Sequence, residues 1–389
     1  MLTLNPELQE FDGWREAPEF LLCRRLSLGA MQCIDGKTVC VTSGTNFFAS
    51  ELIKTLLEKG CHVRTTVRDC QNLAKTQHLI EMQTQFNGQL ELLEAEFIEP
   101  GAFDKVVEGC EYVFHTSFPS DHPYHSPDVA TLGTKHLFDS VAKHKGQVKK
   151  VIITSSFACI CGFADGEVPG GGRAVFNEED WNSTSTKDHR PFLYVKVCAE
   201  RAAWASVEEH KIPMVVLCPT HELSPPLPAS PDGSWKMPWM YIKAMLEGGI
   251  VDIDFPIIDN RDLAVAHIKA AELTGVSNER IIVSHAHKFP PSWVMSKMQE
   301  MFPDIELGKP DPPQYQEPTP FLDNSKMRDL LGVELRPVEE TLRDTCQSFI
   351  DKGMAKPVPK GQDLSRNPPL VTGVKPPSLG GHHYTTINL

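Results

Sequence analysis

Residues 37–50 read Lys37-Thr-Val-Cys-Val-Thr-Ser-Gly-Thr-Asn-Phe-Phe-Ala-Ser50, a β-branched run that passes through small residues into a helical pattern. Apolar residues then recur at helical spacing until Gly60. A strand, a tight turn and a helix in this order predict the opening unit of a dinucleotide-binding fold. Such a unit binds pyrophosphate through the helix N-terminus, and glycines let the backbone approach the phosphates. Here the three glycine positions hold Ser43, Asn46 and Ala49.

Strand-like and helix-like segments alternate along the following residues. We expect strands at residues 62–67, 90–95, 112–115, 150–154 and 214–218, and helices at residues 73–85, 102–108, 128–143 and 193–210. Strands separated by helices imply right-handed crossovers and a parallel sheet. The sequence therefore predicts an α/β protein with a doubly wound parallel sheet, the Rossmann fold, followed by a smaller C-terminal substrate lobe.

Changes in composition suggest the domain boundaries. Residues 1–35 lack a clean period and are expected to be a mobile extension, and residues 36–220 are expected to form the nucleotide-binding domain. A Pro-rich segment at 219–238 then leads into residues 221–352, which we expect to be mainly the substrate lobe. Within it, residues 250–258 and 281–285 are expected to be extended, and the chain is expected to return to the Rossmann domain near 250–275. Residues 353–389 are rich in Pro and Gly and are expected to be a mobile tail.

Bulk composition excludes some classes of function. The net charge of −13 disfavours nucleic acid or an anionic membrane as the main partner, because a basic field drives such binding. The first ten residues lack the pattern of a signal or transit peptide, so a cytoplasmic location is expected. The eleven cysteines lack Cys-x-x-Cys spacing and are expected to be reduced core thiols. His285 and His287 have no further ligand at a known spacing, so no metal site is predicted.

Seven further motifs follow the opening turn in order. They are Val63-Arg-Thr-Thr-Val-Arg-Asp69, Gly109-Cys-Glu-Tyr-Val-Phe-His115, Val151-Ile-Ile-Thr-Ser-Ser156, Glu178-Glu-Asp-Trp181, Lys196-Val-Cys-Ala-Glu-Arg-Ala-Ala-Trp204, Asp259-Asn-Arg-Asp-Leu-Ala-Val-Ala-His267 and Asp323-Asn-Ser-Lys326. With these motifs, residues 37–352 resemble the extended short-chain dehydrogenase/reductases of the NAD-dependent epimerase/dehydratase superfamily. Within that group they are similar to the dihydroflavonol reductase and cinnamoyl-CoA reductase branch. The resemblance implies an oxidoreductase fold, and the activity has to be argued from the site.

The cofactor that the resemblance implies is NADP(H). Arg68 lies where the adenosine ribose is met, and its guanidinium can pair with a 2′-phosphate that a carboxylate would repel. In the reductases that this chain resembles, a Lys seven residues later shares that role, and Lys75 is at this spacing. Glu96 occupies the place of an Asp by the adenine. The full set expected at the cofactor is Ser43, Thr45, Asn46, Phe47, Phe48, Arg68, Lys75, Glu96, Phe97, Thr116, Ser117, Lys196 and Pro219.

The missing glycines weaken this expectation. A left-handed backbone costs roughly 1–2 kcal/mol for most residues, with Asn among the least penalised, so Asn46 is able to hold that conformation. A turn built this way would meet the pyrophosphate less closely, and affinity falls about tenfold for each 1.4 kcal/mol lost. The alternative is that the pocket holds no cofactor.

The reaction centre departs from the family at one position. In the family's mechanism a Tyr exchanges a proton with the substrate oxygen, a Lys four residues later lowers the phenol pKa and binds ribose, and a Ser orients the oxygen. Ser156 and Lys196 match the Ser and the Lys, and Phe192 stands in place of the Tyr. General acid catalysis contributes about 10²–10⁴-fold, so this difference removes most of the rate. Tyr194 is a poor substitute, because it lies two residues before Lys196, which is a rotation of about 200° around a helix, and should point away from the face that carries Lys196.

The resemblance also suggests where a substrate and a proton relay would lie. Substrate-pocket residues are expected to be Phe118, Phe157, His221 and Trp239, and His136 stands where the family has an Asn that holds a relay water. Two interpretations stay open. One is a reductase that acts on a carbonyl or acyl thioester of a bulky aromatic molecule. The other is a catalytically silent relative that serves as a nucleotide-binding regulatory or interaction protein.

Overall fold

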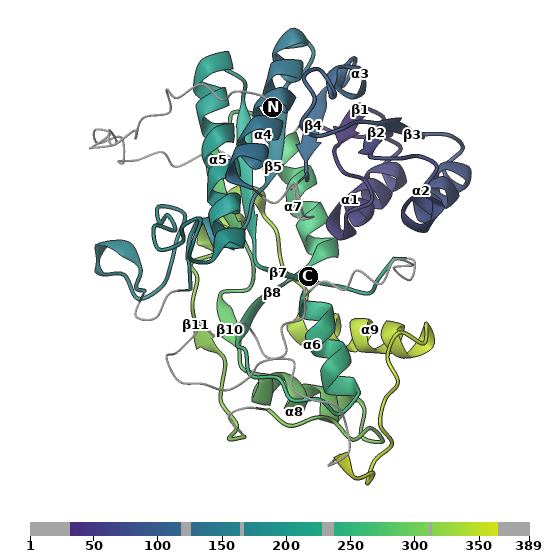
Figure 1. Cartoon of the computed structure of the whole chain (residues 1–389), viewed down its shortest axis with the longest axis vertical. Helices are drawn as coiled ribbons and strands as arrows, with labels where there is room; N and C mark the ends of the chain where they lie inside the picture. Colours follow the sequence, from purple (N-terminus) through teal and green to yellow (C-terminus); the bar gives the residue numbers. More distant parts are fainter. Residues whose placement is uncertain (1–31, 118–125, 164–166, 228–236, 311–312, 365–389) are drawn as a thin grey trace.

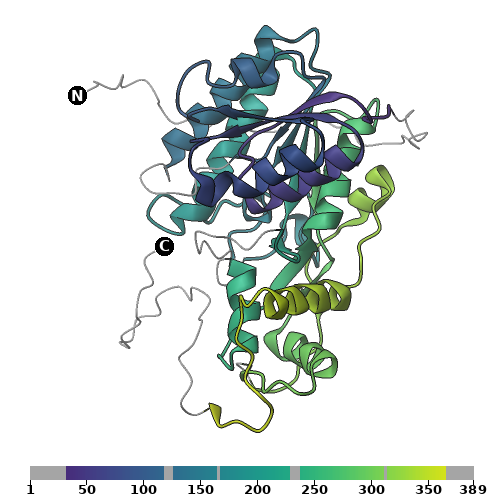
Figure 2. The same cartoon turned by 90° about the vertical axis from the view of Figure 1, so that its right-hand side faces the viewer.

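The structure, a computed structural model, describes residues 32–117, 126–163, 167–227, 237–310 and 313–364. Within these residues the chain forms a larger α/β domain and a smaller lobe. Figures 1 and 2 show the larger domain above the lobe, and the chain passes between them more than once.

A seven-stranded sheet, counted over the described residues, is the centre of the larger domain. Its order is β3-β2-β1-β4-β5-β6-β9, and every neighbouring pair is parallel. The strands are β1 (Thr38–Val41), β2 (His62–Val67), β3 (Leu90–Glu94), β4 (Tyr112–His115), β5 (Lys150–Thr154), β6 (Met214–Pro219) and β9 (Glu279–Val283). The predicted doubly wound parallel sheet is confirmed.

Helices cover both faces of this sheet. One face packs on α1 (Phe47–Glu58), α2 (Leu73–Gln85) and α7 (Asn260–Glu272). The other packs on α3 (Asp104–Val107), α4 (Pro127–Lys143) and α5 (Pro191–His210). Strand β1 shows why the sequence requires this arrangement, because Val39 and Val41 belong to the first core and Cys40 to the second. A strand buried on both faces is apolar at successive positions.

Strand β9 corrects one expectation. Residues 281–285 were expected to be an extended part of the small lobe, but Glu279–Val283 pairs with β6 at the edge of the large sheet. The apolar side chains of Ile281 and Ile282 enter opposite cores of the larger domain. A short apolar strand carries no signal in its own sequence for the sheet that it joins.

The smaller lobe has a four-stranded sheet, in the described residues, with the order β11-β10-β8-β7. Its strands are β7 (His221–Leu223), β8 (Phe255–Asp259), β10 (His287–Phe289) and β11 (Thr319–Pro320). Its helices are α6 (Met237–Leu246), α8 (Pro291–Met301) and α9 (Val338–Asp351). Short helical turns elsewhere in the described chain are η1 (Phe157–Cys159), η2 (Gly170–Gly172) and η3 (Met327–Leu331). Helices α6, α8 and α9 and strands β7, β8 and β10 share a separate hydrophobic core, whereas η1 packs in the core under α4 and α5 and η3 in the core under α1 and α7.

Asp259 lies at the junction of the two parts, between β8 and α7. Its carboxylate accepts hydrogen bonds from the Nε and Nη2 atoms of Arg261 at 2.9 and 2.7 Å and from Thr341 Oγ1 of α9 at 2.8 Å. Arg261 also pairs with Asp344 of α9 at 2.7 Å. The motif at residues 259–267 therefore ties the small lobe to the larger domain.

The described ends of the chain are attached to the fold. Ile34 is fully buried in the core, and Gln32 N donates to Glu272 O at 2.7 Å. At the other end, Val358 N donates to Leu246 O at 3.2 Å and Lys360 N to Asp304 O at 2.8 Å. The expected mobile extension therefore does not run as far as residue 35, and the expected mobile tail does not begin at residue 353. The remainder of both, at 1–31 and 365–389, lies outside the described residues.

Candidate functional site

The turn between β1 and α1 forms with one left-handed residue, and that residue is Ser43 with φ +59°. Its backbone N–H donates to Thr66 Oγ1 at 2.7 Å, which holds the strained residue in place. Asn46 has φ −70° and ψ 146°, so it does not use the left-handed conformation that its residue type tolerates. Asn46 is instead the N-cap of α1, and its side chain accepts from Phe48 N at 3.3 Å.

Gly44 shows why this turn keeps one glycine. A Cβ at this position would lie 2.3 Å from Thr65 Oγ1, and the buried Thr65 cannot move away because its hydroxyl donates to Val41 O at 2.7 Å. Among the described residues, no acceptor is found for the backbone N–H groups of Thr45 and Phe47. Two unpaired N–H groups at a helix N-terminus are the arrangement that binds phosphate.

The end of β4 is joined to this turn through Thr42. The Thr42 hydroxyl oxygen accepts from the backbone N–H groups of Thr116 and Ser117, both at 3.1 Å. The Asn46 side-chain amide donates to Thr116 O at 3.3 Å. Thr116 and Ser117 therefore lie beside the turn, as expected of cofactor-binding residues.

Phe97 follows β3 and lies next to His115, the last residue of β4. The two rings are parallel, with centroids 6.2 Å apart. Burial lowers the pKa of His115 to about 3, so its ring is neutral, and Thr42 Oγ1 lies 3.0 Å from its Nδ1 atom. A Cβ on Gly133 of α4 would lie 1.9 Å from the Phe97 ring, so the aromatic side chain fits because Gly133 has none.

The residues expected at the ribose phosphate and adenine lie at the ends of β2 and β3. Arg68 directly follows β2 and is exposed, and Lys75 is exposed in the first turn of α2. The neighbouring Asp69 accepts a hydrogen bond from Gln71 N at 2.8 Å, so its carboxylate caps the local turn. Glu96 lies two residues beyond the end of β3 and is half-buried.

The residues expected at the reaction centre come from the end of β5 and the first turns of α5. Ser156 is half-buried and is the N-cap of η1, where its Oγ atom accepts from Ala158 N at 3.1 Å. Lys196 lies one turn after Phe192 on α5, and its Nζ atom is 5.8 Å from the centroid of the Phe192 ring. The Phe192 side chain is 48% exposed. The ammonium group therefore lies against an aromatic ring that carries no proton donor.

Tyr194 occupies a different face of α5. The pKa of the Tyr194 phenol is raised, mainly by the neighbouring Cys198 thiol and secondly by burial. The charge of Asp128 also raises this pKa, and the charge of Arg201 lowers it. Asp128 belongs to α4, so Tyr194 is directed toward α4. This placement agrees with the helical geometry that makes Tyr194 a poor substitute for the missing phenol.

Comparison with known proteins now places this geometry in a family. The family model described as the NAD dependent epimerase/dehydratase family matches residues 39–283. The chain belongs to this family. It is 31% identical over 336 residues to cinnamoyl-CoA reductase CAD2 of Medicago truncatula, which covers 82% of this chain and 98% of the relative. It is also 33% identical over 273 residues to anthocyanidin reductase of Arabidopsis thaliana, which covers 65% of this chain and 78% of the relative.

A solved structure gives the same result for the fold. The structure of Gre2 from Candida albicans in complex with NADPH matches with a TM-score of 0.67 and 26% identity, over 81% of this chain and 99% of that one. The resemblance to the extended short-chain dehydrogenase/reductases is confirmed. In this epimerase/dehydratase family member, no helix of the described residues has the length and apolarity needed to cross a membrane.

The residues expected to line a substrate pocket lie in different parts of the fold. Phe157 directly follows Ser156 and is buried beside Phe176 and Phe321, with ring centroids 6.2 and 5.2 Å away. His221 follows Pro219, the last residue of β6, and burial lowers its pKa to about 4. Phe118 lies outside the described residues.

Trp239 is placed in the core of the small lobe. It is 3% exposed, and its indole N–H donates to Ser224 O at 3.1 Å. Its ring packs on Phe349 of α9 and on Phe47 of α1, with centroids 5.7 and 4.2 Å away. Phe47, expected at the cofactor, thus also joins the nucleotide-binding turn to the small lobe.

His136 is buried on α4 with an unpaired ring nitrogen. It is 7% exposed, and its Nδ1 atom has no hydrogen-bond partner among the described residues. A buried, unpaired nitrogen of this kind is often satisfied by an ordered water. This environment is compatible with the proton-relay role that the resemblance implies.

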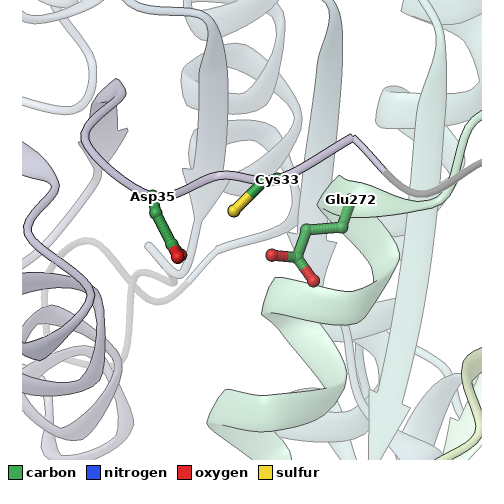
Figure 3. Close-up of side chains that lie close together, drawn as sticks. All are labelled: Cys33, Asp35 and Glu272. Atoms are coloured by element: carbon green, nitrogen blue, oxygen red, sulfur yellow. The ribbon is translucent and has the colours of Figure 1, made fainter.

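Cys33, Asp35 and Glu272 form a cluster that the sequence did not indicate (Figure 3). Their ligand-type atoms lie within 4.8 Å of one another, and in the figure the Glu272 side chain extends from the end of α7 toward Cys33 and Asp35, which lie on the segment before β1. Lys59 Nζ lies 2.9 Å from Asp35 Oδ1 and 3.9 Å from Glu272 Oε1, and Ile34 N donates to the same Glu272 oxygen at 3.3 Å. An ammonium group therefore already balances the charge that a metal ion would meet.

Proposed function

We propose that this protein binds NADP(H) and has the framework of a carbonyl reductase whose proton donor has been replaced by Phe192. The observation that carries the proposal is the turn at residues 43–47. Ser43 supplies its left-handed residue, Gly44 its close approach, and Thr45 and Phe47 its unpaired N–H groups. These features fit a pyrophosphate group.

The chain's own residues have separate tasks in this proposal. Arg68 and Lys75 would bind the 2′-phosphate, and the Lys196 ammonium would bind the nicotinamide ribose. Ser156 would donate its hydroxyl hydrogen to a carbonyl oxygen. Ala158 N donates to Ser156 Oγ and uses only an acceptor site of that oxygen, so the hydroxyl hydrogen remains available. When bound, the cofactor supplies or accepts a hydride.

The substrate class proposed is a carbonyl or acyl thioester on a bulky aromatic small molecule. The names of the relatives, cinnamoyl-CoA reductase and anthocyanidin reductase, support this class. The aromatic rings of Phe157, Phe163 and Phe321 also support it, because they pack on one another and Phe157 directly follows Ser156. With no phenol at position 192, the proton would come from water, Ser156 or His136.

A second function is favoured by one specific observation. The Lys196 ammonium lies over a Phe192 ring that is half exposed, so the site carries charge and apolar surface without an acid. This arrangement suits a protein that binds the nucleotide and does not turn it over. Such a protein would act as a nucleotide-responsive regulatory or interaction module.

A titration of the purified protein with NADPH, followed by nicotinamide fluorescence, tests the shared part of both functions. We expect saturable binding with an enhanced and blue-shifted signal. Gly44→Ala should abolish binding because its Cβ would overlap Thr65, whereas Gly146→Ala should bind like the parent because no atom lies within 4 Å of its added Cβ. Absence of binding by the folded parent at hundreds of micromolar NADPH would refute both functions.

A further inference from the structure

Glu200 is a buried carboxylate at the centre of a polar cluster below the reaction centre. It lies one helical turn after Lys196 on α5 and is 2% exposed. Its Oε1 atom accepts from Arg280 Nε at 2.6 Å and from Trp204 Nε1 at 3.2 Å. Its Oε2 atom accepts from the Ser155 hydroxyl. Both oxygens are therefore occupied by partners from three separate elements or segments.

Arg280 extends this cluster to the segment between Ser156 and α5. Its Nη1 atom donates to Asp180 O at 2.6 Å and to Glu178 O at 3.1 Å, and its guanidinium lies 4.0 Å from the centroid of the Trp181 ring. Glu178 in turn accepts from Ile282 N of β9 at 2.9 Å. The buried charges of Glu200 and Arg280 thus hold the 178–181 segment on the edge of the large sheet.

Ser155 connects the cluster to the reaction centre. Its peptide N–H donates to Leu217 O of β6 at 2.8 Å, and its hydroxyl also lies 3.3 Å from Cys159 Sγ of η1. The next residue is Ser156. A single carboxylate therefore fixes the residue before Ser156 and the helix turn after Lys196 relative to each other.

We propose that Glu200 is a positioning residue, which sets the Lys196 ammonium and the Ser156 hydroxyl at the separation needed to hold the nicotinamide ribose and a carbonyl oxygen. Resting on the proposed function, it names how that site is assembled. Arg280 also balances the charge of Glu200, so the carboxylate does not capture the Lys196 ammonium four residues away. Neither residue touches the reacting atoms in this role.

Ser155→Ala is the sharpest test, because it removes one hydrogen bond and leaves the Glu200–Arg280 ion pair in place. We expect NADPH to bind about tenfold more weakly, as for the loss of a hydrogen bond to a charged group. Ser206→Ala is the matched control, since Ser206 is a buried serine on the same helix whose hydroxyl donates to Ala202 O at 2.9 Å. It should bind NADPH within about twofold of the parent. Ser155→Thr keeps the hydroxyl and should restore binding.

Hydrogen–deuterium exchange of the full chain without NADPH supplies a readout that does not depend on the cofactor. In Ser155→Ala, the amides of residues 156–161 and 191–197 should exchange faster together, and in Ser206→Ala neither segment should change. Faster exchange with unchanged NADPH affinity would make Glu200 merely structural and overturn the proposal, as would unchanged exchange. If the parent binds no NADPH, the proposed function fails. Whether or not NADPH binds, two segments that do not loosen together in Ser155→Ala overturn the positioning role.

Discussion

The Nζ atom of Lys196 lies 5.8 Å from the centroid of the Phe192 ring, one helical turn earlier on α5. A cation at this distance from an aromatic face is stabilised by about 0.5–1 kcal/mol at an exposed site. The ring thus replaces one function of the phenol, its contact with the lysine, and lacks the other, an acidic proton. Substitutions at position 192 can therefore test proton transfer separately from cofactor binding.

Phe192→Tyr should therefore create or raise NADPH-dependent carbonyl reduction by about 10²–10⁴-fold, the range of a general acid. The added hydroxyl would extend from a ring that is already 48% exposed, so no buried group has to move. The measurement is NADPH consumption with a panel of aromatic aldehydes, ketones and acyl thioesters.

The control for this substitution is Phe86→Tyr, which adds a phenol to another partly exposed ring, at the C-cap of α2 and outside the residues proposed to bind cofactor or substrate. Its rate should equal that of the parent. A parent that already reduces a substrate at a rate unaffected by Phe192→Tyr would show that another group donates the proton.

Arg68→Ala combined with Lys75→Ala should remove the preference for NADPH over NADH. Loss of charge-assisted hydrogen bonds to a phosphate should weaken NADPH binding by about 10- to 100-fold, and NADH binding should change little because it has no 2′-phosphate. Both affinities are measured by fluorescence titration. Lys54→Ala removes an exposed cation on α1 that pairs with Glu58, and it should leave the ratio unchanged. Equal losses for NADPH and NADH would argue against phosphate recognition.

The sheet was predictable because its pattern is local. Each of the first six strands has β-branched or apolar residues of its own, and a helix between two such strands requires a parallel crossover. Strand β9 was assigned to the wrong part because pairing with β6 depends on residues more than 60 positions earlier. A separation of 80 residues likewise hid the contact between Glu200 and Arg280.

The turn shows a different limit of sequence reasoning. The residue types indicated a nucleotide-binding turn, but propensity pointed to Asn46, and not to Ser43, as the residue able to hold a left-handed conformation. The structure assigns it to Ser43 because Thr66, on the next strand, receives its N–H, and Asn46 is needed as the cap of α1. A tertiary hydrogen bond here outweighs a backbone preference of about 1–2 kcal/mol.

Ser43→Gly should accordingly strengthen NADPH binding, by up to about tenfold for 1.4 kcal/mol of removed strain and steric hindrance. Lys211→Gly is the matched control, since Lys211 also has a left-handed backbone, with φ +54°, at the exposed end of α5. It should change thermal stability to a similar extent and leave NADPH affinity unchanged. Equal effects of both variants on affinity would show that only global stability had changed.

Two buried histidines should make stability depend on pH. His115 and His267 are 3% and 0% exposed, and burial lowers the pKa of each to about 3. The pKa of an unfolded histidine is about 6.5, so at a pH between the folded and unfolded pKa values the unfolded chain binds protons that the folded chain does not. Unfolding free energy should therefore fall as pH drops below 6.5, by about 1.4 kcal/mol per pH unit for each histidine.

His267→Gln should reduce this pH dependence by the share of one histidine. In the folded protein the His267 Nδ1 atom lies 2.8 Å from Leu263 O and its Nε2 atom lies 2.7 Å from Thr154 Oγ1, so the neutral ring is paired on both sides. The variant should be less stable at pH 7 because these bonds change. Urea unfolding at pH 6, 5.5 and 5 should nevertheless give a slope lower than that of the parent by about 1.4 kcal/mol per pH unit. Identical slopes for the two proteins would show that His267 takes up its proton in the folded state, and that its burial does not exclude charge.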